Sequence, residues 1–470
     1  MTTASAAEGA GNAFIVGAGF SKAIDRRMPD TDALGRLITT RPDVATHGRI
    51  PSQFEHGAFE SWLSALAGDQ PYLTEPENLE QRALFGRIAR ALVGTLSAIE
   101  AEVLSTDADA WLYELLSVFH FQHPTVISLN YDTLLEAAVM THSLWDGGTS
   151  RTIDAGDILQ NTPPNPAYTE MWDLPAPLIE DTFRLIKLHG SLDWFWVGQD
   201  PTGLSLLRRD SLSRFGSPAS VDATTRAREL QGREPFIVPP ATAKSEYYRV
   251  PVMRFLWTQA LEALREARRV FLVGYSLPPA DPVILGLLRD AFRDRVPELW
   301  VVNPSPEPPL LGLESLGIDR ESVTVLDSID CVAALSQQLR DQAAGDLVTQ
   351  IRGLDPTAAK GENMFLAWGD PRAMVGPSAR VGVIGLAQSD GDLLLEPANG
   401  AVSTAAGSPD SPPSLADLLP RLPGVKRLVA LMADGRKLPL VGSWRPAGLP
   451  PNPPSSFVIF APAGKPQSFE

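Results

Sequence analysis

The sequence predicts an α/β fold: a doubly wound parallel sheet with a helical insertion, followed by a smaller C-terminal domain that contains strands. Over the first 350 residues or so, apolar runs of strand length alternate with longer segments of helical period. Several of these runs end in glycine or a small polar residue, which is typical of open sheets that bind nucleotides. After about Leu354 the composition shifts toward Pro, Gly, Ser and Ala. We therefore expect a Rossmann-like domain over residues 13–350 and a second domain over residues 355–470.

The strands of the first domain are predicted from short apolar runs. They are Phe14–Val16, Thr125–Leu129, Leu185–Leu188, Phe236–Val238, Val270–Val273, Leu299–Val302 and Val323–Leu326. Between the first two runs the pattern is helical, over Leu34–Ile38, Phe59–Leu66, Leu79–Val103 and Ala108–Phe119. This is more helix than one crossover needs, so we expect a helical insertion over about residues 30–120.

Three other segments have a distinctive composition. Residues 1–12 are small and polar, which predicts a flexible N-terminus. The stretch Thr141 to Asp181 is rich in Pro, Gly, Asn and Thr, and we expect an extended loop near the site. In the C-terminal domain the expected strands are Val381–Leu386, Leu428–Met432 and Phe457–Phe460. That domain carries no catalytic constellation, so a regulatory or assembly role is expected for it.

Composition excludes several classes of protein. The net charge of −16 disfavours general binding of nucleic acid, because it repels phosphate backbones. The single cysteine, Cys331, excludes an intrachain disulfide framework and any four-cysteine zinc site. No apolar stretch approaches the about 18 residues of a spanning helix, and Met1 to Asn12 has no apolar core like that of a signal peptide. We expect a cytoplasmic protein that does not enter the membrane.

The first segment that could carry chemistry is the glycine turn after Phe14–Val16. Gly17, Ala18, Gly19 and Ser21 follow this strand, and a helix is expected to begin near Ser21. Glycines let backbone N–H groups approach a pyrophosphate without an intervening Cβ. A strand that ends in a glycine turn also occurs for purely structural reasons, so the motif alone leaves both readings open.

Two further segments place polar residues directly after a buried strand. Asn130 and Asp132 follow Thr125–Leu129, at the edge where open α/β sheets bind ligands. Either residue could instead cap the helix expected over Thr133 to Met140. His189 follows Leu185–Leu188 and suits proton transfer, although a lone histidine at a strand end is more often structural. The other histidines show no ligand spacing, so no metal site is expected.

The fourth segment combines Gly274 and Ser276 with Asp281-Pro282. A strand, a Gly-x-Ser turn, and then Asp as N-cap with Pro at the first helical position form a strand–turn–helix unit. Asn303 ends the next strand and suits a ribose hydroxyl. Several such strand ends together are what a doubly wound nucleotide site requires.

Taken in order, these motifs resemble the Sir2 superfamily, and within it the Sir2-like NADase domains of bacterial anti-phage defence proteins. The resemblance covers roughly Ala13 to Leu339. It is carried by GAGFS (17–21), LNYD (129–132), KLHGSLDW (187–194), VGYSL (273–277) and VVNP (301–304).

The resemblance implies that NAD binds as a substrate to be cleaved. Gly17, Ala18, Gly19 and Ser21 would then hold the NAD phosphates. Asn130 would hold the nicotinamide ribose and orient water, Asp132 would bind the carboxamide, and His189 would be the general base. The phosphate and adenosine-ribose side would be contacted by Gly274, Ser276 and Asn303.

The sequence departs from the Sir2 deacylases in two places. Their paired-cysteine zinc module is absent, because this chain has one cysteine. Their Ile-Pro-Asp-Phe-Arg segment is matched only by Met28-Pro29-Asp30-Thr31. Both departures argue against acyl-lysine chemistry and leave cleavage of the N-glycosidic bond in place.

The leading hypothesis is an NAD glycohydrolase that depletes cellular NAD in defence and is triggered through its C-terminal region, with homo-oligomer formation as a further expectation. One alternative is an NAD-dependent deacylase or ADP-ribosyltransferase that acts on a protein. Another is a sensor that binds NAD or ADP-ribose without turnover. The presence of both Asn130 and His189 disfavours the sensor.

Overall fold

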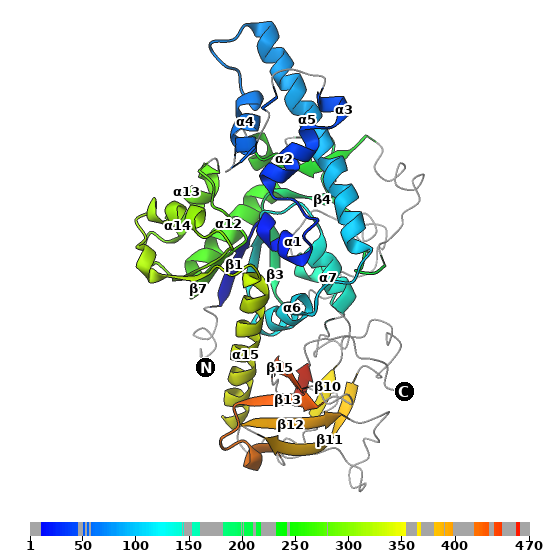
Figure 1. Ribbon diagram of the computed structural model, residues 1–470, viewed down its shortest axis with the longest axis vertical. Coiled ribbons are helices and arrows are strands. Elements are labelled where there is room, and N and C mark those ends of the chain that lie inside the picture. The colour runs from blue at the N-terminus through cyan, green and yellow to red at the C-terminus, as the bar shows by residue number, and fades with distance from the viewer. Residues whose placement is uncertain are drawn as a thin grey trace.

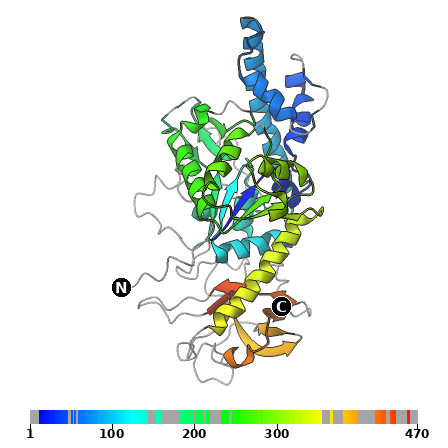
Figure 2. The ribbon, with the colours of Figure 1, turned by 90° about the vertical axis from the view of Figure 1, so that its left-hand side faces the viewer.

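The computed structural model shows an α/β core, a helical arm at one end and a C-terminal sheet at the other (Figures 1 and 2). The described residues are 11–45, 50–51, 54–55, 58–142, 144, 153–159, 182–198, 200, 202–209, 213–217, 232–241, 245–279, 281–353, 364–367, 380–389, 391–397, 418–431, 437–443 and 457–460. No helix among them is long and apolar enough to cross a membrane.

The core is a six-stranded sheet in the order β3-β2-β1-β7-β8-β9, and every strand pair in it is parallel. Its strands are β1 (Asn12–Val16), β2 (Thr125–Ser128), β3 (Arg184–Lys187), β7 (Arg269–Val273), β8 (Glu298–Val302) and β9 (Val323–Leu326). The predicted doubly wound sheet is confirmed. The chain adds β2 and β3 on one side of β1, and then β7, β8 and β9 on its other side. The topological switch point therefore lies between β1 and β7.

Helices cover both faces of this sheet, and alternate residues of each strand serve the two layers. On β1, Phe14 packs with α1 (Ala18–Ile24), α6 (Ala110–Gln122), α7 (Leu134–His142) and α15 (Cys331–Arg352), and its ring stacks on Phe271 at 4.6 Å. Ile15 faces the other layer, made by α12 (Pro251–Glu266), α13 (Pro282–Ala291) and α14 (Glu307–Glu314). A 3-10 turn at Arg320–Ser322 precedes β9.

The predicted insertion between β1 and β2 is helical. It contains α2 (Thr31–Thr39), α3 (Pro42–Ala45), α4 (Ala58–Ala67) and α5 (Glu75–Leu104), which precede α6. A capping box between Thr74 and Glu77 satisfies backbone donors at the start of α5. The arm has its own apolar core, in which Phe59 and Leu63 are fully buried. Its helices rise above the parallel sheet in Figure 1.

One predicted strand belongs to a different sheet. Phe236–Val238 was expected beside the parallel strands, whereas β6 (Glu234–Ile237) pairs antiparallel with β4 (Gly190–Trp196) in the three-stranded order β5-β4-β6. The chain reverses at Gly190, whose φ of +78° only glycine adopts readily, and this turn brings β4 against β6. The third strand is β5 (Leu207–Arg208). The strand β4 was not predicted.

Two other expectations are changed at their boundaries. The N-terminal segment expected over residues 1–12 is shorter, because Asn12 already belongs to β1, and residues 1–10 lie outside the described residues. Most of the loop expected from Thr141 to Asp181 also lies outside them, and its described part contains the short helix α8 (Ala155–Ile158). A second short helix, α11 (Ser245–Tyr248), precedes α12.

The C-terminal region forms the predicted separate sheet. Its order is β14-β13-β12-β11-β10-β16-β15, seven strands of mixed direction. They are β10 (Met364–Ala367), β11 (Arg380–Ser389), β12 (Asp392–Pro397), β13 (Arg427–Leu431), β14 (Lys437–Pro439), β15 (Val441–Ser443) and β16 (Phe457–Phe460), with a 3-10 turn at Leu419–Arg421. The three expected strands correspond to β11, β13 and β16.

The long helix α15 joins the two sheets (Figure 2). Val441 of β15 is buried in the same apolar cluster as the residues of α6 and α15. At the end of α15, Arg352 donates to the carbonyl oxygens of Leu422 and Val425.

Candidate functional site

A cavity of about 1120 Å³ opens at the carboxyl ends of β1 and β7, at the switch point of the sheet. Small-molecule sites are typically about 300–1,000 Å³, so this cavity has room for a dinucleotide. Its lining includes every residue that the sequence predicted for the site. These are Gly17, Ala18, Gly19, Ser21, Asn130, Asp132, His189, Gly274, Ser276 and Asn303. Residues from five separate segments are thus brought to one edge of the sheet.

On the side of β1 and β7 the wall is backbone. The N–H of Gly19 donates to the carbonyl of Gly274 at 2.8 Å, and the N–H of Gly17 donates to Val273 at 3.1 Å. A Cβ on Gly19 would lie 2.7 Å from the Cα of Gly274, and one on Gly274 would lie 2.2 Å from the backbone nitrogen of Phe20. Gly274 also has φ +60°. The two turns need glycine to pack against each other, in addition to any contact with a ligand.

The helix after the first turn begins earlier than expected. It starts at Ala18, so Ser21 lies inside α1. The hydroxyl of Ser21 is 2% exposed and donates to Oδ2 of Asp132 at 2.7 Å. The structure therefore places Ser21 at the cavity wall, in a hydrogen-bond network with Asn130 and Asp132.

Asn130 completes that network. Its Nδ2 donates to the carbonyl of Gly17 at 2.9 Å and to the hydroxyl of Ser21 at 2.8 Å. Because a carbonyl can only accept, the bond to Gly17 fixes which end of the amide carries the nitrogen. Both N–H groups of Nδ2 are then used, and the amide oxygen Oδ1 is the group that Asn130 can offer to a hydroxyl or to water.

Asp132 serves both of the roles that the sequence left open. Its Oδ2 accepts from Ser21, and its Oδ1 accepts from the backbone N–H of Leu134, the first residue of α7, at 3.3 Å. It therefore joins the network and also helps to cap the helix that follows.

Two buried ionisable side chains, Lys187 and Glu100, hold the loop that carries Asn130 and Asp132. Lys187 is 1% exposed, and its Nζ contacts the carbonyl of Asp132 at 2.6 Å and the carboxylate of Glu136 at 2.9 Å. The carboxylates of Glu136, Asp193 and Asp132 raise the pKa of Lys187 against the effect of burial. Glu100, from α5, accepts from the backbone N–H and the hydroxyl of Thr133 at 2.5 and 3.0 Å. Burial raises the pKa of Glu100 to about 8.

His189 lies at the inner end of the cavity and is 7% exposed. The turn to β4 places it there: the N–H of Leu188 donates to Ser128, and the carbonyl of His189 accepts from Val238. Its ring lies 6.4 Å from that of Tyr131, and its Nε2 lies 3.7 Å from Oδ2 of Asp281.

Four cavity residues around His189 were not identified from the sequence as site residues. Asp281, predicted only as a helix cap, makes no side-chain capping bond at α13 and lines the cavity instead. Tyr131 and Tyr275 line the cavity beside it, and Glu60 reaches it from α4 of the arm. Glu60 is 7% exposed, although a charged residue on a helix normally faces solvent.

The outer end of the cavity is formed by Ser276, Asn303 and the start of α15. Ser276 is exposed, and Oδ1 of Asn303 accepts from the N–H of Ser305 at 3.0 Å, which leaves its Nδ2 to donate. Residues 329–333 at the start of α15 also line this end.

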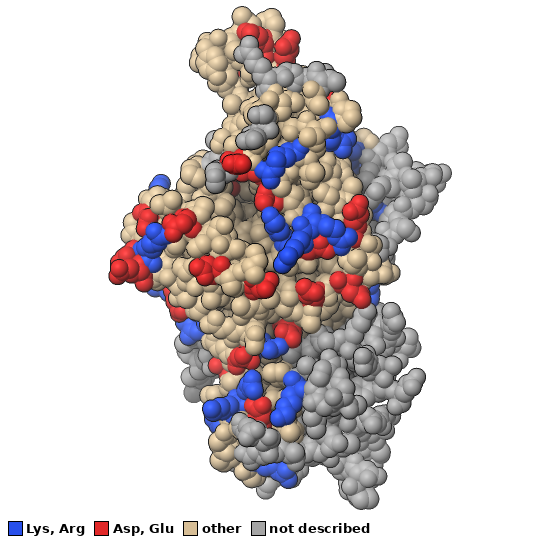
Figure 3. Space-filling view, in the orientation of Figure 1, with Lys and Arg blue, Asp and Glu red and all other residues tan. Residues whose placement is uncertain are grey.

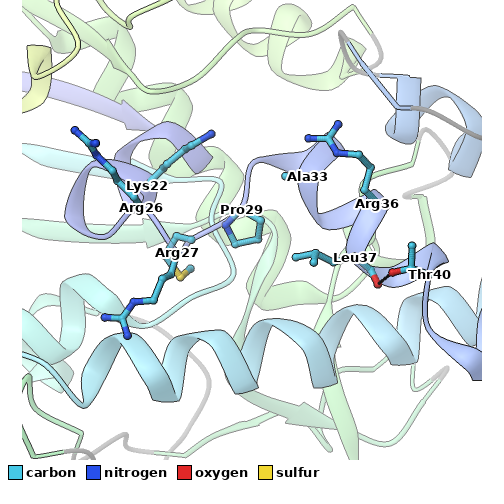
Figure 4. A pocket seen from close by; sticks show the side chains of 9 residues that line it. Lys22, Arg26, Arg27, Pro29, Ala33, Arg36, Leu37 and Thr40 are labelled. Carbon is cyan, nitrogen blue, oxygen red and sulfur yellow. Dashed lines mark hydrogen bonds between the residues drawn. The ribbon is translucent and has the colours of Figure 1, made fainter.

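A second, smaller pocket of about 400 Å³ adjoins the cavity mouth. Lys22, Arg26, Arg27 and Arg36 line it, and we call these four residues the basic rim. In Figure 4, Lys22 and Arg26 point the same way, whereas Arg27 points toward α5, and Pro29 and Leu37 lie between them and Arg36. The face in Figure 3 is hollowed between the arm and the core, with Lys and Arg side chains along one border. This is a local positive patch on a chain of net charge −16.

The described residues contain no group of three or more His, Cys, Asp and Glu side chains placed to hold a metal ion.

A scan against protein-family models and a search of curated proteins find no match. Among solved structures, similarity is found to "Crystal structure of a Sir2 homolog-NAD complex", at 15% identity over 70% of this chain and 90% of the other, with a TM-score of 0.33. A structure described as "Structural Basis for the Mechanism and Regulation of Sir2 Enzymes" gives 14% identity over 70% and 93%, with a TM-score of 0.34. "Sir2-p53 peptide-NAD+" gives 14% identity over 70% and 92%, with a TM-score of 0.31.

All three structures are of Sir2 proteins, the family that the sequence motifs resemble. At these identities and TM-scores the likeness assigns no role to a residue.

Proposed function

We propose that the chain binds NAD in this cavity and hydrolyses its nicotinamide N-glycosidic bond, releasing nicotinamide and ADP-ribose. The location supports a dinucleotide, because doubly wound sheets bind dinucleotides across the switch point, where the cavity lies. The basic rim at the mouth supports an anionic ligand.

The observation that carries the proposal is that Asn130 and His189 share one cavity with the glycine turns. The pyrophosphate would lie beside the backbone of these turns, with Ala18 and Ser276 at the same wall. Asn303 would donate to the adenosine ribose from the outer end. The nicotinamide ribose would then lie between Asn130 and His189 at the inner end.

The chemistry needs few groups. The C–N bond breaks through an oxocarbenium-like transition state, nicotinamide leaves with the electron pair of that bond, and a water oxygen bonds to the same carbon. Oδ1 of Asn130 would hold a ribose hydroxyl or the attacking water. His189 would accept a proton from a ribose hydroxyl, and that hydroxyl oxygen would regain a proton from the attacking water, so the net proton released resides on the imidazole. Asp132 would face the carboxamide, held in place by Ser21 and by the bond of Lys187 to its carbonyl.

Water is the acceptor that this site favours. The segment Met28-Pro29-Asp30-Thr31 departs from the deacylase pattern, and Asp30 is used as the N-cap of α2, where it accepts from Ala33 at 2.8 Å. It also pairs with Lys22 at 2.9 Å. This segment is thus committed to the start of the arm. A protein acceptor, as in a deacylase or ADP-ribosyltransferase, is the alternative that the test below separates.

In the cell, we propose that the enzyme depletes cytoplasmic NAD as a regulated defence effector. This role comes from the sequence resemblance alone. A trigger or partner would act through the C-terminal sheet, and assembly into a homo-oligomer is part of the same proposal.

The test is chromatography of NAD after incubation with the purified chain and with its His189→Ala and Asn130→Ala variants. We expect nicotinamide and ADP-ribose in equal amounts from the wild type, and at least about a hundredfold less from His189→Ala, as for loss of a general base. His123→Asn is a matched control, because His123 is exposed at the end of α6 in a left-handed conformation that Asn tolerates.

The other outcomes each contradict the proposal. Cleavage that appears only when an acylated or acceptor protein is added would identify a transferase. Bound but intact NAD in the complete, triggered system would identify a sensor. Near-normal turnover by either site variant would show that the residues are wrongly assigned.

A further inference from the structure

Three properties of Asp281 are not explained by its place before helix α13. It precedes α13, where an Asp side chain normally accepts from the first turn, yet no such capping bond is made. It is 2% exposed, although buried carboxylates are rare unless they have a partner. It lines the same cavity as His189. A local structural role therefore does not account for it.

The contacts of Asp281 point to His189. Its Oδ2 lies 3.7 Å from Nε2 of His189, and the same oxygen accepts from the hydroxyl of Tyr275 at 3.3 Å. The two side chains are 8% and 3% exposed, so water screens this contact weakly. The distance is within the range of an ion pair and longer than a hydrogen bond. Such a contact favours the protonated imidazole over the neutral one.

The tyrosines near His189 do not supply a negative charge in place of Asp281. Tyr131 uses its hydroxyl to donate to the carbonyl of Val238 at 2.8 Å. Burial, and then the charges of Glu60 and Asp281, raise the pKa of Tyr131 above its ordinary value of 10.0, so the phenol keeps its proton. Burial followed by Asp281 does the same for the pKa values of Tyr248 and Tyr275. Glu60, on α4, adds a second negative charge to the same environment.

We propose that Asp281 is the positioning residue of His189 in the reaction proposed above. The carboxylate holds the imidazole ring in its orientation and stabilises the imidazolium that forms when the ring takes a proton. In that step an O–H bond of a ribose hydroxyl breaks and an N–H bond forms on the ring; no electrons leave the site and no further reactant is needed. Asp281 does not touch the substrate, and Tyr275 keeps the carboxylate in place.

The proposal depends on the proposed function, and it makes a claim about His189 that does not need turnover. The kinetic test compares Asp281→Asn, which keeps size and hydrogen-bonding atoms but removes charge, with Asp290→Asn as control. Asp290 lies on the same helix, is exposed, and pairs with Arg293 on the surface. For Asp281→Asn we expect kcat to fall roughly ten- to a hundredfold, by analogy with the range found for carboxylates that orient metal-binding histidines. The Kd for NAD should stay within about twofold.

Two readouts separate positioning from a structural role. The acidic limb of the pH–rate profile should move to lower pH in Asp281→Asn, because the imidazolium loses its neighbouring charge. In a His189→Ala background, Asp281→Asn should cause no further loss, because residues that act as a unit are not additive. A lower Tm with an unchanged profile, or full additivity with His189→Ala, would overturn the proposal.

Histidine NMR keeps this test independent of the reaction. The chain has six histidines, and the signal of His189 is identified by its absence in His189→Ala. Its titration midpoint should move to lower pH in Asp281→Asn and stay unchanged in Asp290→Asn. If the wild type fails to cleave NAD while this shift is present, the proposed function fails and the pairing of Asp281 with His189 stands. If the shift is absent, the pairing itself is wrong.

Discussion

The two sides of the cavity differ in whether backbone or side chains form the wall. The side at β1 and β7 is backbone packed on backbone, with Gly17 and Gly19 in contact with Gly274 and its carbonyl. The side at β2 and β3 is made of side chains, with Asn130 and Asp132 held from behind by Lys187. The first depends on the absence of Cβ atoms and the second on buried charges with exact partners.

Because of this difference, we expect substitutions on the two sides of the cavity to have different effects on the protein. A substitution in the backbone-made side displaces main chain, and main chain cannot move aside like the end of a flexible side chain. A substitution in the side-chain-made side changes protonation or pairing and leaves the sheet in place. The effects of pH should therefore be concentrated on the β2–β3 side, and steric effects on the β1–β7 side.

The largest effect is expected for Gly274→Ala. The new Cβ would lie 2.2 Å from the backbone nitrogen of Phe20, and φ +60° adds about 1–2 kcal/mol for a residue that is not glycine. Thermal unfolding should show a lower Tm, and the rise in Tm on adding NAD should disappear. Gly286→Ala is the matched control, because it lies in α13 with nothing within 4 Å of an added Cβ. It should be neutral or slightly stabilising, and equal losses from both variants would refute the comparison.

A smaller, pH-dependent effect is expected for Glu100→Gln. The pKa of Glu100 is about 8 in the folded protein, against an ordinary value of 4.5. Between these values the folded state holds a proton that the unfolded state has lost, so wild-type stability falls as pH rises, by up to about 1.4 kcal/mol per pH unit. Glutamine cannot titrate, so the variant should gain stability relative to wild type from pH 5 to pH 8.

Urea unfolding at several pH values measures this slope. Glu102→Gln, at an exposed position of the same helix, is the control and should leave the slope unchanged. A slope in Glu100→Gln equal to that of the wild type would show that the carboxyl group is already ionised in the folded state.

The smallest effect is expected at the basic rim. Arg26 is exposed at the cavity mouth, so Arg26→Gln should weaken NAD binding by about two- to fivefold at low salt and not at all at high salt, where screening removes the attraction. Arg289→Gln, at an exposed position of α13, should have no effect at any salt concentration. Isothermal titration calorimetry at two ionic strengths distinguishes the two variants, and a salt-independent loss would mean that Arg26 contacts the ligand directly.

The parts of the fold that could be predicted from the sequence are those with a local cause. The six parallel strands are short apolar runs that end in glycine or a polar residue, and that ending also marks the edge where the cavity forms. The strand β4 was missed because the strands are predicted from apolar runs, and Ser191 and Asp193 interrupt the apolar residues of β4, although all seven of its residues are buried. Pairing between β4 and β6 depends on a turn at Gly190 and on residues 38 to 47 positions apart.

The site residues that the sequence did not identify are of two kinds: Asp281 fits a local role as a helix cap, and Glu60 and Glu100 show no local signal of a role in the site. Asp281 before a proline fits a helix cap, and that reading concealed its contact with His189. Glu60 and Glu100 lie on helices of the insertion, where a charged residue normally faces solvent. Only tertiary packing, which brings α4 and α5 against the loop after β2, gives them their roles.

The helix α15 connects the cavity to the C-terminal region. Its 22 residues span about 33 Å, from residues that line the cavity to Arg352, which donates to the carbonyl oxygens of Leu422 and Val425 in the segment that leads into β13 of the C-terminal sheet. Between them, Ser336 donates to the carbonyl of Trp111 on α6, another cavity residue. Coupling between two binding sites is reciprocal. If a partner that docks on the C-terminal sheet changes the affinity for NAD through α15, then NAD in the cavity changes the affinity for that partner by the same factor.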